Sequence, residues 1–367
     1  MEKSKTLLHT ALTVLLACGM GVLPCRSQST SSVDCFNAGI FFVQDSSAVT
    51  FQGSFSNSSA AQFSNNGQIL FRKDFFNYQP NLNSPGIFSF TSTVPQHIAG
   101  TRPVRVATLI TDNSSGISLE NSLEVIRSHQ FLNGLIASAS SDTYLAYEDG
   151  IQITGTSDKN HVIGWVRKSG SADFTFPVGD SQFLRTVTIK DLSQPSWFAV
   201  SYEAPGLTPT QVAAPLVSAH PNEFWWINRL QGGSATVELN WEANKVPLPF
   251  RILNDLRGGY YQNQVWNNRG GLVSGDVMTS GTILLNNQTE FGAYAVATVG
   301  SLVPLKLLSF TGERKKGYSA LYWTSANEGA SSKFMIERSE DALHFVRIGE
   351  VQALNQYNQN KIGRAHV

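Results

Sequence analysis

The stretch VTFQGSFSN, residues 49–57, is followed 20 positions later by ILFRKDFFN, residues 69–77. Matching residues recur at four positions of the two segments: Val49 with Ile69, Phe51 with Phe71, Phe55 with Phe75, and Asn57 with Asn77. A period near 20 residues, with two short strands and an Asn-bearing turn, is typical of one turn of a β-solenoid. We therefore predict a solenoid-like region over residues 28–140, in which each Phe stacks on the next. The alternative is a meander of antiparallel hairpins.

Alternation of apolar and polar residues continues along the chain, as in VRVATLI from Val104 and ISLENSLEVI from Ile117. Such alternation is typical of half-buried strands, and helical periodicity is almost absent. From Tyr144 the segments are longer and richer in large aromatics, which favours a β-sandwich over residues 141–300. Asn at the repeated turn is expected to cap backbone groups of the neighbouring solenoid turn. The predicted fold class is all-β.

Composition limits the class of function. Of the 367 residues, 41% are hydrophobic and 15% are charged, and the formal net charge is zero. An ordered chain with few charges and many polar turn residues is typical of secreted β-proteins. Because no basic patch stands out, nucleic acid is a poor candidate for a partner.

The N-terminus has the pattern of a signal peptide, residues 1–27, with a basic start, an apolar run and a small polar end. One alternative is a membrane anchor, but the apolar run is shorter than the roughly 20 residues of a membrane span. The other alternative is a lipoprotein signal at Cys18. Removal of the peptide would also remove Cys18 and Cys25. Cys35 then has no intramolecular partner, so we expect a mature chain without a disulfide or a transmembrane segment.

Three segments resemble large secreted proteins of bacteria that have the type IX secretion system. One region runs from Asn160 to Ile189 and contains Phe174, Phe176, Pro177, Val178 and Gly179, followed by the strand RTVTI; EFWWINRL from Glu223 is similar to a second element. The denser match begins at Leu302 and resembles the fibronectin-III-like domain that precedes the C-terminal sorting domain of those proteins. Its matching residues are Pro304, Leu305, Leu307, Phe310, Trp323, Thr324, Ala326, Glu328, Phe334, Ile336, Arg338, Ser339, Asp341, Phe345, Ile348, Gly349 and Val351.

This resemblance implies a partial fibronectin-III/Ig-like module over residues 301–360, without catalytic residues. The match stops after the fourth strand, and the last seven residues, KIGRAHV, back-translate to a sequencing adapter. We therefore interpret residues 361–367 as a non-native tail that packs on nothing. The apolar layer of the partial module should be partly exposed. The resemblance implies that a sorting domain, missing here, connects the protein to the secretion machinery.

Candidate chemistry is sparse. Adjacent aromatics are candidates for stacking on a sugar: Trp225, Trp226, Tyr260, Tyr261 and Trp266. Since neighbours in a strand point to opposite faces, one member of each pair is expected in the core. Four carboxylates in one region are the candidates for a glycosidase pair: Glu203, Glu223, Glu238 and Glu242. The histidines show no metal-ligand spacing: His97, His129, His161, His220 and His344. We expect no cofactor and no metal.

The sequence therefore favours a secreted, non-enzymatic structural or adhesion protein on the outer surface of a bacterial outer membrane. Its partners would be the secretion machinery and surface glycans or other cells. Two alternatives stay open: a carbohydrate-binding surface module, which an exposed aromatic pair would favour, and a β-helix polysaccharide-degrading enzyme, which a groove of clustered acidic and basic side chains would favour.

Overall fold

The computed structural model describes residues 32–138, 140–207, 211–300, 306–326, 333–341, 343–352 and 361–366. Within these ranges the chain is almost entirely β-strand and turn, with one short 3-10 helix, η1 (Leu253–Asp255), and no α-helix. The all-β prediction is therefore confirmed. The predicted signal peptide, residues 1–27, lies outside the described residues.

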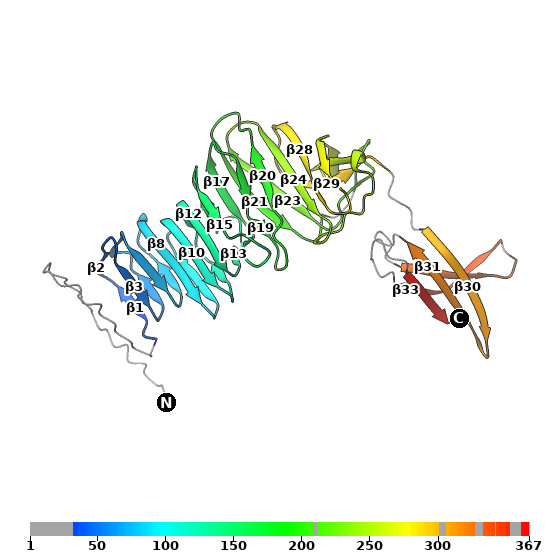
Figure 1. Cartoon of the computed structure of the whole chain (residues 1–367), viewed down its shortest axis with the longest axis horizontal. Helices are drawn as coiled ribbons and strands as arrows, with labels where there is room; N and C mark the ends of the chain where they lie inside the picture. The colour runs from blue at the N-terminus through cyan, green and yellow to red at the C-terminus, as the bar shows by residue number, and fades with distance from the viewer. Residues whose placement is uncertain are drawn as a thin grey trace. The chain divides into compact units, whose positions relative to one another are not determined.

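A β-solenoid of about 6 turns begins at Cys35 (Figure 1). One of its faces, the short-strand sheet, contains eight strands in the order β1 (Cys35–Asn37), β4 (Phe55–Asn57), β7 (Phe75–Asn77), β9 (Gln96–Gly100), β11 (Ile117–Leu119), β13 (Ile136–Ser138), β16 (Val162–Ile163) and β19 (Val178–Gly179). Every neighbouring pair in this sheet is parallel.

The opposite face, the long-strand sheet, is also parallel through the solenoid. Its solenoid strands are β3 (Ala48–Phe51), β6 (Gln68–Phe71), β8 (Leu82–Ser92), β10 (Val104–Asn113), β12 (Leu123–Asn133), β14 (Leu145–Tyr147) and β17 (Val166–Gly170). The first two turns have a third side, formed by β2 (Ile40–Val43) and β5 (Gln62–Asn65). Strand β15 (Gln152–Thr154) pairs with β12.

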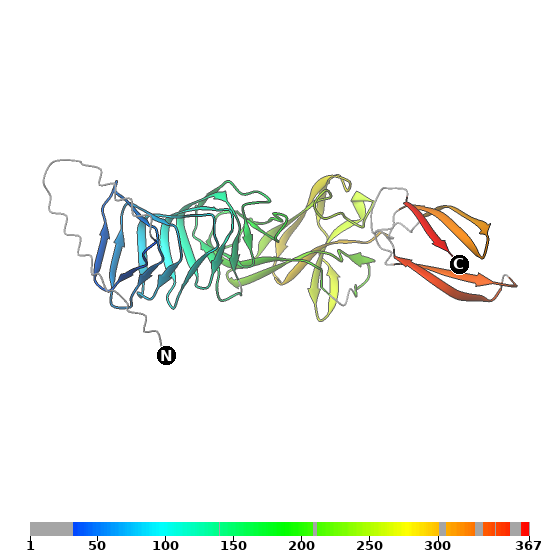
Figure 2. The ribbon, with the colours of Figure 1, turned by 90° about the horizontal axis from the view of Figure 1, so that it is seen from below.

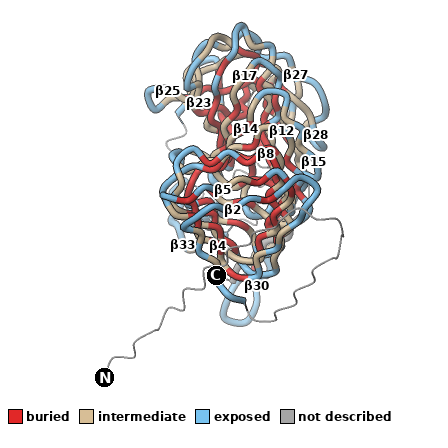
Figure 3. The backbone as a smooth tube through the Cα atoms, turned by 90° about the vertical axis from the view of Figure 1, so that its left-hand side faces the viewer, coloured by how far each residue is buried: buried red, intermediate tan, exposed pale blue. Residues whose placement is uncertain are grey.

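The 20-residue repeat in the sequence matches the pairing register of the first solenoid strands. Val49 lies opposite Ile69 and Phe51 opposite Phe71 in one parallel pair, and Phe55 lies opposite Phe75 in another. The hairpin alternative, which requires antiparallel pairing, is therefore wrong. Because parallel in-register strands place equivalent side chains above one another, the rings stack: the centroids of Phe55 and Phe75 are 6.0 Å apart with planes 14° apart. Buried backbone lines the inside of the stacked turns (Figure 3).

Parallel pairing continues beyond the boundary predicted at residue 140. Strand β14 pairs with β17, and β16 pairs with β19 at Gly179. The core residues Val162, Val166 and Val178 are fully buried there. They extend the apolar interior. The connections after residue 140 are longer, so the repeat spacing is not visible in the sequence there.

Beyond β17 the long-strand sheet becomes antiparallel. It continues through β21 (Ser196–Glu203), β23 (Phe224–Gln231), β29 (Ala293–Thr298), β25 (Leu256–Gln262) and β26 (Val265–Asn268), with β22 (Ser218–Ala219) beside β29. A second antiparallel sheet contains β18 (Phe174–Phe176), β20 (Val187–Lys190), β24 (Ala235–Glu242), β28 (Ser280–Gln288) and β27 (Leu272–Gly275) (Figure 2). Side chains from both sheets, including Val200, Trp225, Val237 and Trp241, belong to the same apolar core as the solenoid interior.

The C-terminal strands form two small antiparallel sheets. Strands β30 (Lys306–Lys315), β31 (Tyr318–Ala326) and β34 (Lys361–His366) form one antiparallel sheet, and β32 (Lys333–Ser339) pairs with β33 (Phe345–Gln352). The expectation that residues 361–367 pack on nothing is wrong for the backbone of 361–366, which pairs along β31. The expectation of partial exposure is confirmed, since Leu307 is 53% exposed, Phe310 59% and Phe345 58%.

Candidate functional site

The four glutamates proposed as glycosidase candidates serve as hydrogen-bond or ion-pair partners in the structure. Glu223 is completely buried beside Arg185, which is also completely buried. The Arg185 guanidinium donates two hydrogen bonds to the Glu223 carboxylate, from Nε to Oε2 at 2.9 Å and from an Nη to Oε1 at 2.7 Å. The Tyr202 hydroxyl donates to Glu223 Oε2 at 3.1 Å. Such a charge-assisted pair engages both oxygens of the carboxylate.

Electrostatics in this buried network agree with a structural role. Burial acts to lower the pKa of Arg185, but the Glu223 carboxylate outweighs burial and the pKa rises above its ordinary value. Burial, followed by the charge of Glu223, raises the pKa of Tyr202. The backbone carbonyl of Arg185 accepts a hydrogen bond from the Trp225 indole at 2.8 Å. The network therefore joins β23 and β21 to the segment that precedes β20.

Each of the other three glutamates also has a partner. Lys190 lies 2.5 Å from Glu238, and Lys245 lies 3.1 Å from Glu242. Glu203 accepts a hydrogen bond from the Ser201 hydroxyl at 3.4 Å, and burial raises its pKa. The sequence grouped these residues by proximity along the chain, but the fold gives them different partners.

The aromatic candidates do not form an exposed platform. Trp225, Tyr260 and Trp266 are buried, so they are unavailable to stack on a ligand. Trp226 and Tyr261 are partly buried and pack on a second apolar cluster that contains Trp266. As expected from strand geometry, Trp225 faces the main core while its neighbour faces the other side. The sequence missed Trp197 of β21, which is 52% exposed.

Histidines and the cysteine are dispersed. His129, His161 and His220 are buried separately, and His97 and His344 pair with Glu120 and Asp341. In the ranges that the structure covers, no group of three or more His, Cys, Asp or Glu side chains could hold a metal ion. Cys35 is half-buried and free, and burial raises the pKa of its thiol.

A hollow of about 450 Å³ lies on the outer corner of the first turns of the solenoid. We call it the corner hollow; its walls are Phe36, Ser58, Ser59, Tyr78, Pro80, Thr101 and Arg102. These residues come from successive turns: Phe36 from β1, the two serines after β4, Tyr78 and Pro80 after β7, and the last two after β9. Its volume falls in the range of small-molecule sites.

A ladder of asparagines builds this corner. Asn37 donates through Nδ2 to Asn57 Oδ1 at 2.9 Å, and Asn57 donates through Nδ2 to Asn77 Oδ1 at 3.2 Å. Backbone bonds follow the same steps, since the amide of Ser58 donates to the Asn37 carbonyl and that of Tyr78 donates to the Asn57 carbonyl. The predicted capping of a neighbouring turn's backbone is confirmed at Asn77, whose Nδ2 donates to the Arg102 carbonyl, whereas the Nδ2 groups of Asn37 and Asn57 donate to side chains.

Asn77 also fixes the backbone around Tyr78 and Arg102, two residues in the wall of the hollow. Its Nδ2 donates to the carbonyls of Gln79 at 3.0 Å and Arg102 at 3.1 Å, and its Oδ1 accepts from the Gln79 amide. Tyr78 is thus held in a short closed turn, and Arg102 is tied to it. Gly100 permits this approach: its φ is +106°, and a Cβ there would collide with the Asn77 carbonyl.

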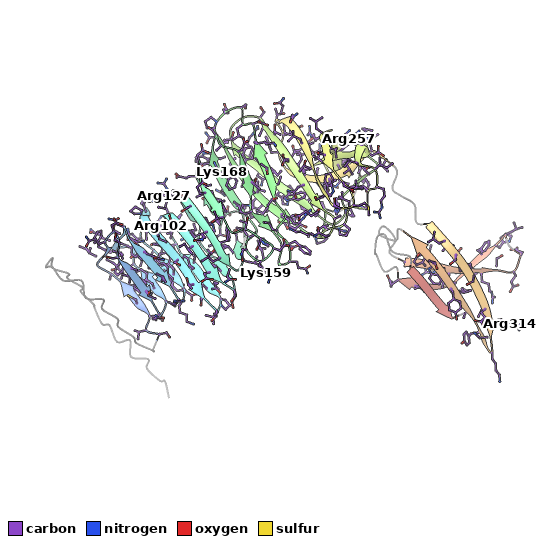
Figure 4. The ribbon with its side chains drawn as sticks, in the orientation of Figure 1. Arg102, Arg127, Lys159, Lys168, Arg257 and Arg314 are labelled. Carbon is purple, nitrogen blue, oxygen red and sulfur yellow. The ribbon has the colours of Figure 1, made fainter. Side chains whose placement is uncertain are left out.

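The polar groups around the corner hollow differ in their accessibility. The Ser58 hydroxyl oxygen is buried and has no hydrogen-bond partner within the described residues. The Arg102 side chain is exposed, and none of the described acidic residues forms an ion pair with it. Figure 4 places Arg102 on the solenoid. Phe36 is 62% exposed and Tyr78 is 37% exposed.

The sequence reasoning missed this hollow. A partial signal was present, because Ser58 and Tyr78 each follow a repeated Asn. Arg102 gave no such signal. The solenoid turn before it is longer than 20 residues, since Asn77 lies opposite Gly100 in the register, so Arg102 falls outside the 20-residue alignment.

No family model, no curated protein and no solved structure matches the chain. A search of the described residues for a helix long and apolar enough to cross a membrane found none.

Proposed function

We propose that this chain is a non-catalytic surface protein whose solenoid presents a fixed binding surface for adhesion. The observation that carries the proposal is the corner hollow, whose walls are contributed by several stacked turns and held by the asparagine ladder. In a solenoid each turn packs on its neighbours, so side chains on its corners keep a set spacing without a lid or hinge. Preorganised surfaces of this kind bind with a low ordering cost.

The proposal of a non-catalytic role also has support from the candidate carboxylates. Glu223, Glu238 and Glu242 are each held by a cation. The β-helix enzyme alternative would need a different acid and base from these. The carbohydrate-binding alternative has one specific observation in its favour, which is the combination of aromatic and hydroxyl groups in the corner hollow.

For location, we propose export by the type IX system to the outer surface of a bacterial outer membrane. The support is the resemblance around Phe174–Gly179 and from Pro304 to Val351 to secreted proteins of that system. The sorting domain of the natural protein would connect it to the secretion machinery.

Antibody labelling of intact cells tests this location. Cells that produce the full-length protein should be labelled without permeabilisation, and a strain that lacks the type IX machinery should retain the protein in the periplasm. Unchanged surface labelling in that strain would reject the export route, and labelling only after permeabilisation would reject the surface role.

A further inference from the structure

Two aromatic side chains border the corner hollow at different heights of the solenoid. Phe36 lies opposite Ser56 in the parallel register, and Ser56 lies opposite Phe76, two residues before Tyr78. Phe36 and Tyr78 therefore belong to turns two steps apart, which is about 10 Å along the stack at roughly 4.8 Å per step. The intervening turn supplies only the small side chains of Ser56, Ser58 and Ser59 at this corner. Small residues between two aromatics leave the space that the hollow occupies.

Polar groups in the hollow have unused hydrogen-bonding capacity. The hydroxyls of Ser59 and Thr101 line its wall, and both residues are exposed. Aromatic faces combined with several hydroxyls match a pyranose ring, which has apolar C–H faces and a rim of hydroxyl groups.

The charge of the hollow selects among saccharides. Among the described residues, Arg102 is its single charged wall residue, and no carboxylate lines it. Two hydrogen bonds hold the backbone of Arg102: its carbonyl accepts from Asn77 Nδ2 at 3.1 Å, and its amide donates to the Asn77 carbonyl at 3.3 Å. The backbone that carries the exposed guanidinium is therefore fixed. A guanidinium fork matches a carboxylate in two parallel hydrogen bonds.

We propose that the corner hollow binds a saccharide that carries a carboxylate, with Tyr78 and Phe36 stacking on sugar rings and Arg102 pairing with the acid group. This inference rests on the proposed adhesive function and names the chemistry of its ligand. The exposed hydroxyls of Ser59 and Thr101 exchange hydrogen bonds with ring hydroxyls. The site is a binding site only, and no bond of the saccharide changes.

Titration of the intact 367-residue chain tests the proposal with two probes that differ only in charge. Tetragalacturonate carries the carboxylates, and its fully methyl-esterified form has the same rings without them. Calorimetry at low salt should show binding of tetragalacturonate that is roughly tenfold tighter than binding of the ester, because only the acid can form charge-assisted hydrogen bonds with Arg102. Binding of the acid should weaken as salt is raised.

Variants separate the two interactions. Arg102→Gln should weaken binding of tetragalacturonate roughly tenfold and leave binding of the ester unchanged, whereas Tyr78→Ala should weaken binding of both. Matched controls are Arg127→Gln and Trp197→Ala, which change an exposed cation and an exposed aromatic outside the hollow; both should bind like the wild type. All four side chains are at least 37% exposed or in the exposed class, so these variants should keep the melting temperature of the wild type.

Three results would overturn the proposal. They are no binding of either probe, equal binding of acid and ester, and binding that survives Tyr78→Ala and Arg102→Gln together. If beads coated with the chain still adhere to cells while neither probe binds, this inference fails and the adhesive function stands. If adhesion is also absent, both fail.

Discussion

Replacing Phe71 by alanine should destabilise the first turns of the solenoid strongly. Phe71 is fully buried, and its ring centroid lies 4.9 Å from that of Phe75, 5.1 Å from Phe88 and 5.0 Å from Phe90. Truncating a buried Phe is unfavourable by about 3–5 kcal/mol, through lost apolar burial and the cavity left behind. The three close ring contacts place Phe71 at the upper end of that range, so we expect a loss of about 4–5 kcal/mol.

The loss should be local, because each solenoid turn contacts only its neighbours. Hydrogen exchange followed by mass spectrometry should show reduced protection in β3, β6 and β8, with β24 and β28 unchanged. Phe42→Ala is the matched control, since Phe42 is 57% exposed and should lose less than ~1 kcal/mol. Phe71→Leu should fall between the two, at about 1–1.5 kcal/mol. If Phe71→Ala and Phe42→Ala have the same guanidinium midpoint and the same exchange, the stacked aromatic column is wrong.

Three further predictions concern the asparagine ladder, a buried histidine and the buried ion pair. Asn57→Ala removes donors to Asn77 and Gln79, so the guanidinium midpoint should drop by the equivalent of ~1–3 kcal/mol; an unchanged midpoint would contradict the ladder. Burial lowers the pKa of His129 to about 3. Because the unfolded chain binds the extra proton below pH ~6.5, stability should be complete above that pH and fall toward pH 3 by up to roughly 1.4 kcal/mol per unit, and His129→Leu should remove that part of a pH series of unfolding midpoints. Glu223→Gln leaves the buried Arg185 charge with only the Glu242 carboxylate, 3.6 Å from an Nη, so thermal unfolding should show a loss of about 3 kcal/mol; a wild-type melting temperature would contradict it.

The sequence predicted the solenoid because its first turns have equal length. The pairs Phe51/Phe71 and Phe55/Phe75 are confirmed, since an unbroken 20-residue spacing converts directly into register. The end of the repeat was misplaced because later turns differ in length. His129 was not recognised as an interior residue. It lies opposite Leu109 in the register, and its ring nitrogens form hydrogen bonds with Tyr147 and Thr111 inside the solenoid.

Side-chain partners were harder to predict than strands. Glu223 looked like a candidate acid, but Arg185, 38 positions earlier, neutralises it, and only the fold brings them together. Trp225 and Trp266 are core residues, whereas Trp197 is exposed. Strand β21 is buried on both faces from Phe198 to Tyr202, so an alternating pattern does not single out Trp197. The corner hollow needs turns of unequal length to meet, which spacing alone does not reveal.

Adhesion under flow tests the central claim most directly. Beads coated with the native chain would be passed over cells of the producing bacterium at a fixed shear, and the retained fraction would be counted. The account predicts that native-coated beads are retained and that beads coated with heat-unfolded chain wash away, because only the folded solenoid brings Phe36, Tyr78 and Arg102 together. Equal retention of native and unfolded coatings, or none with either, would contradict it.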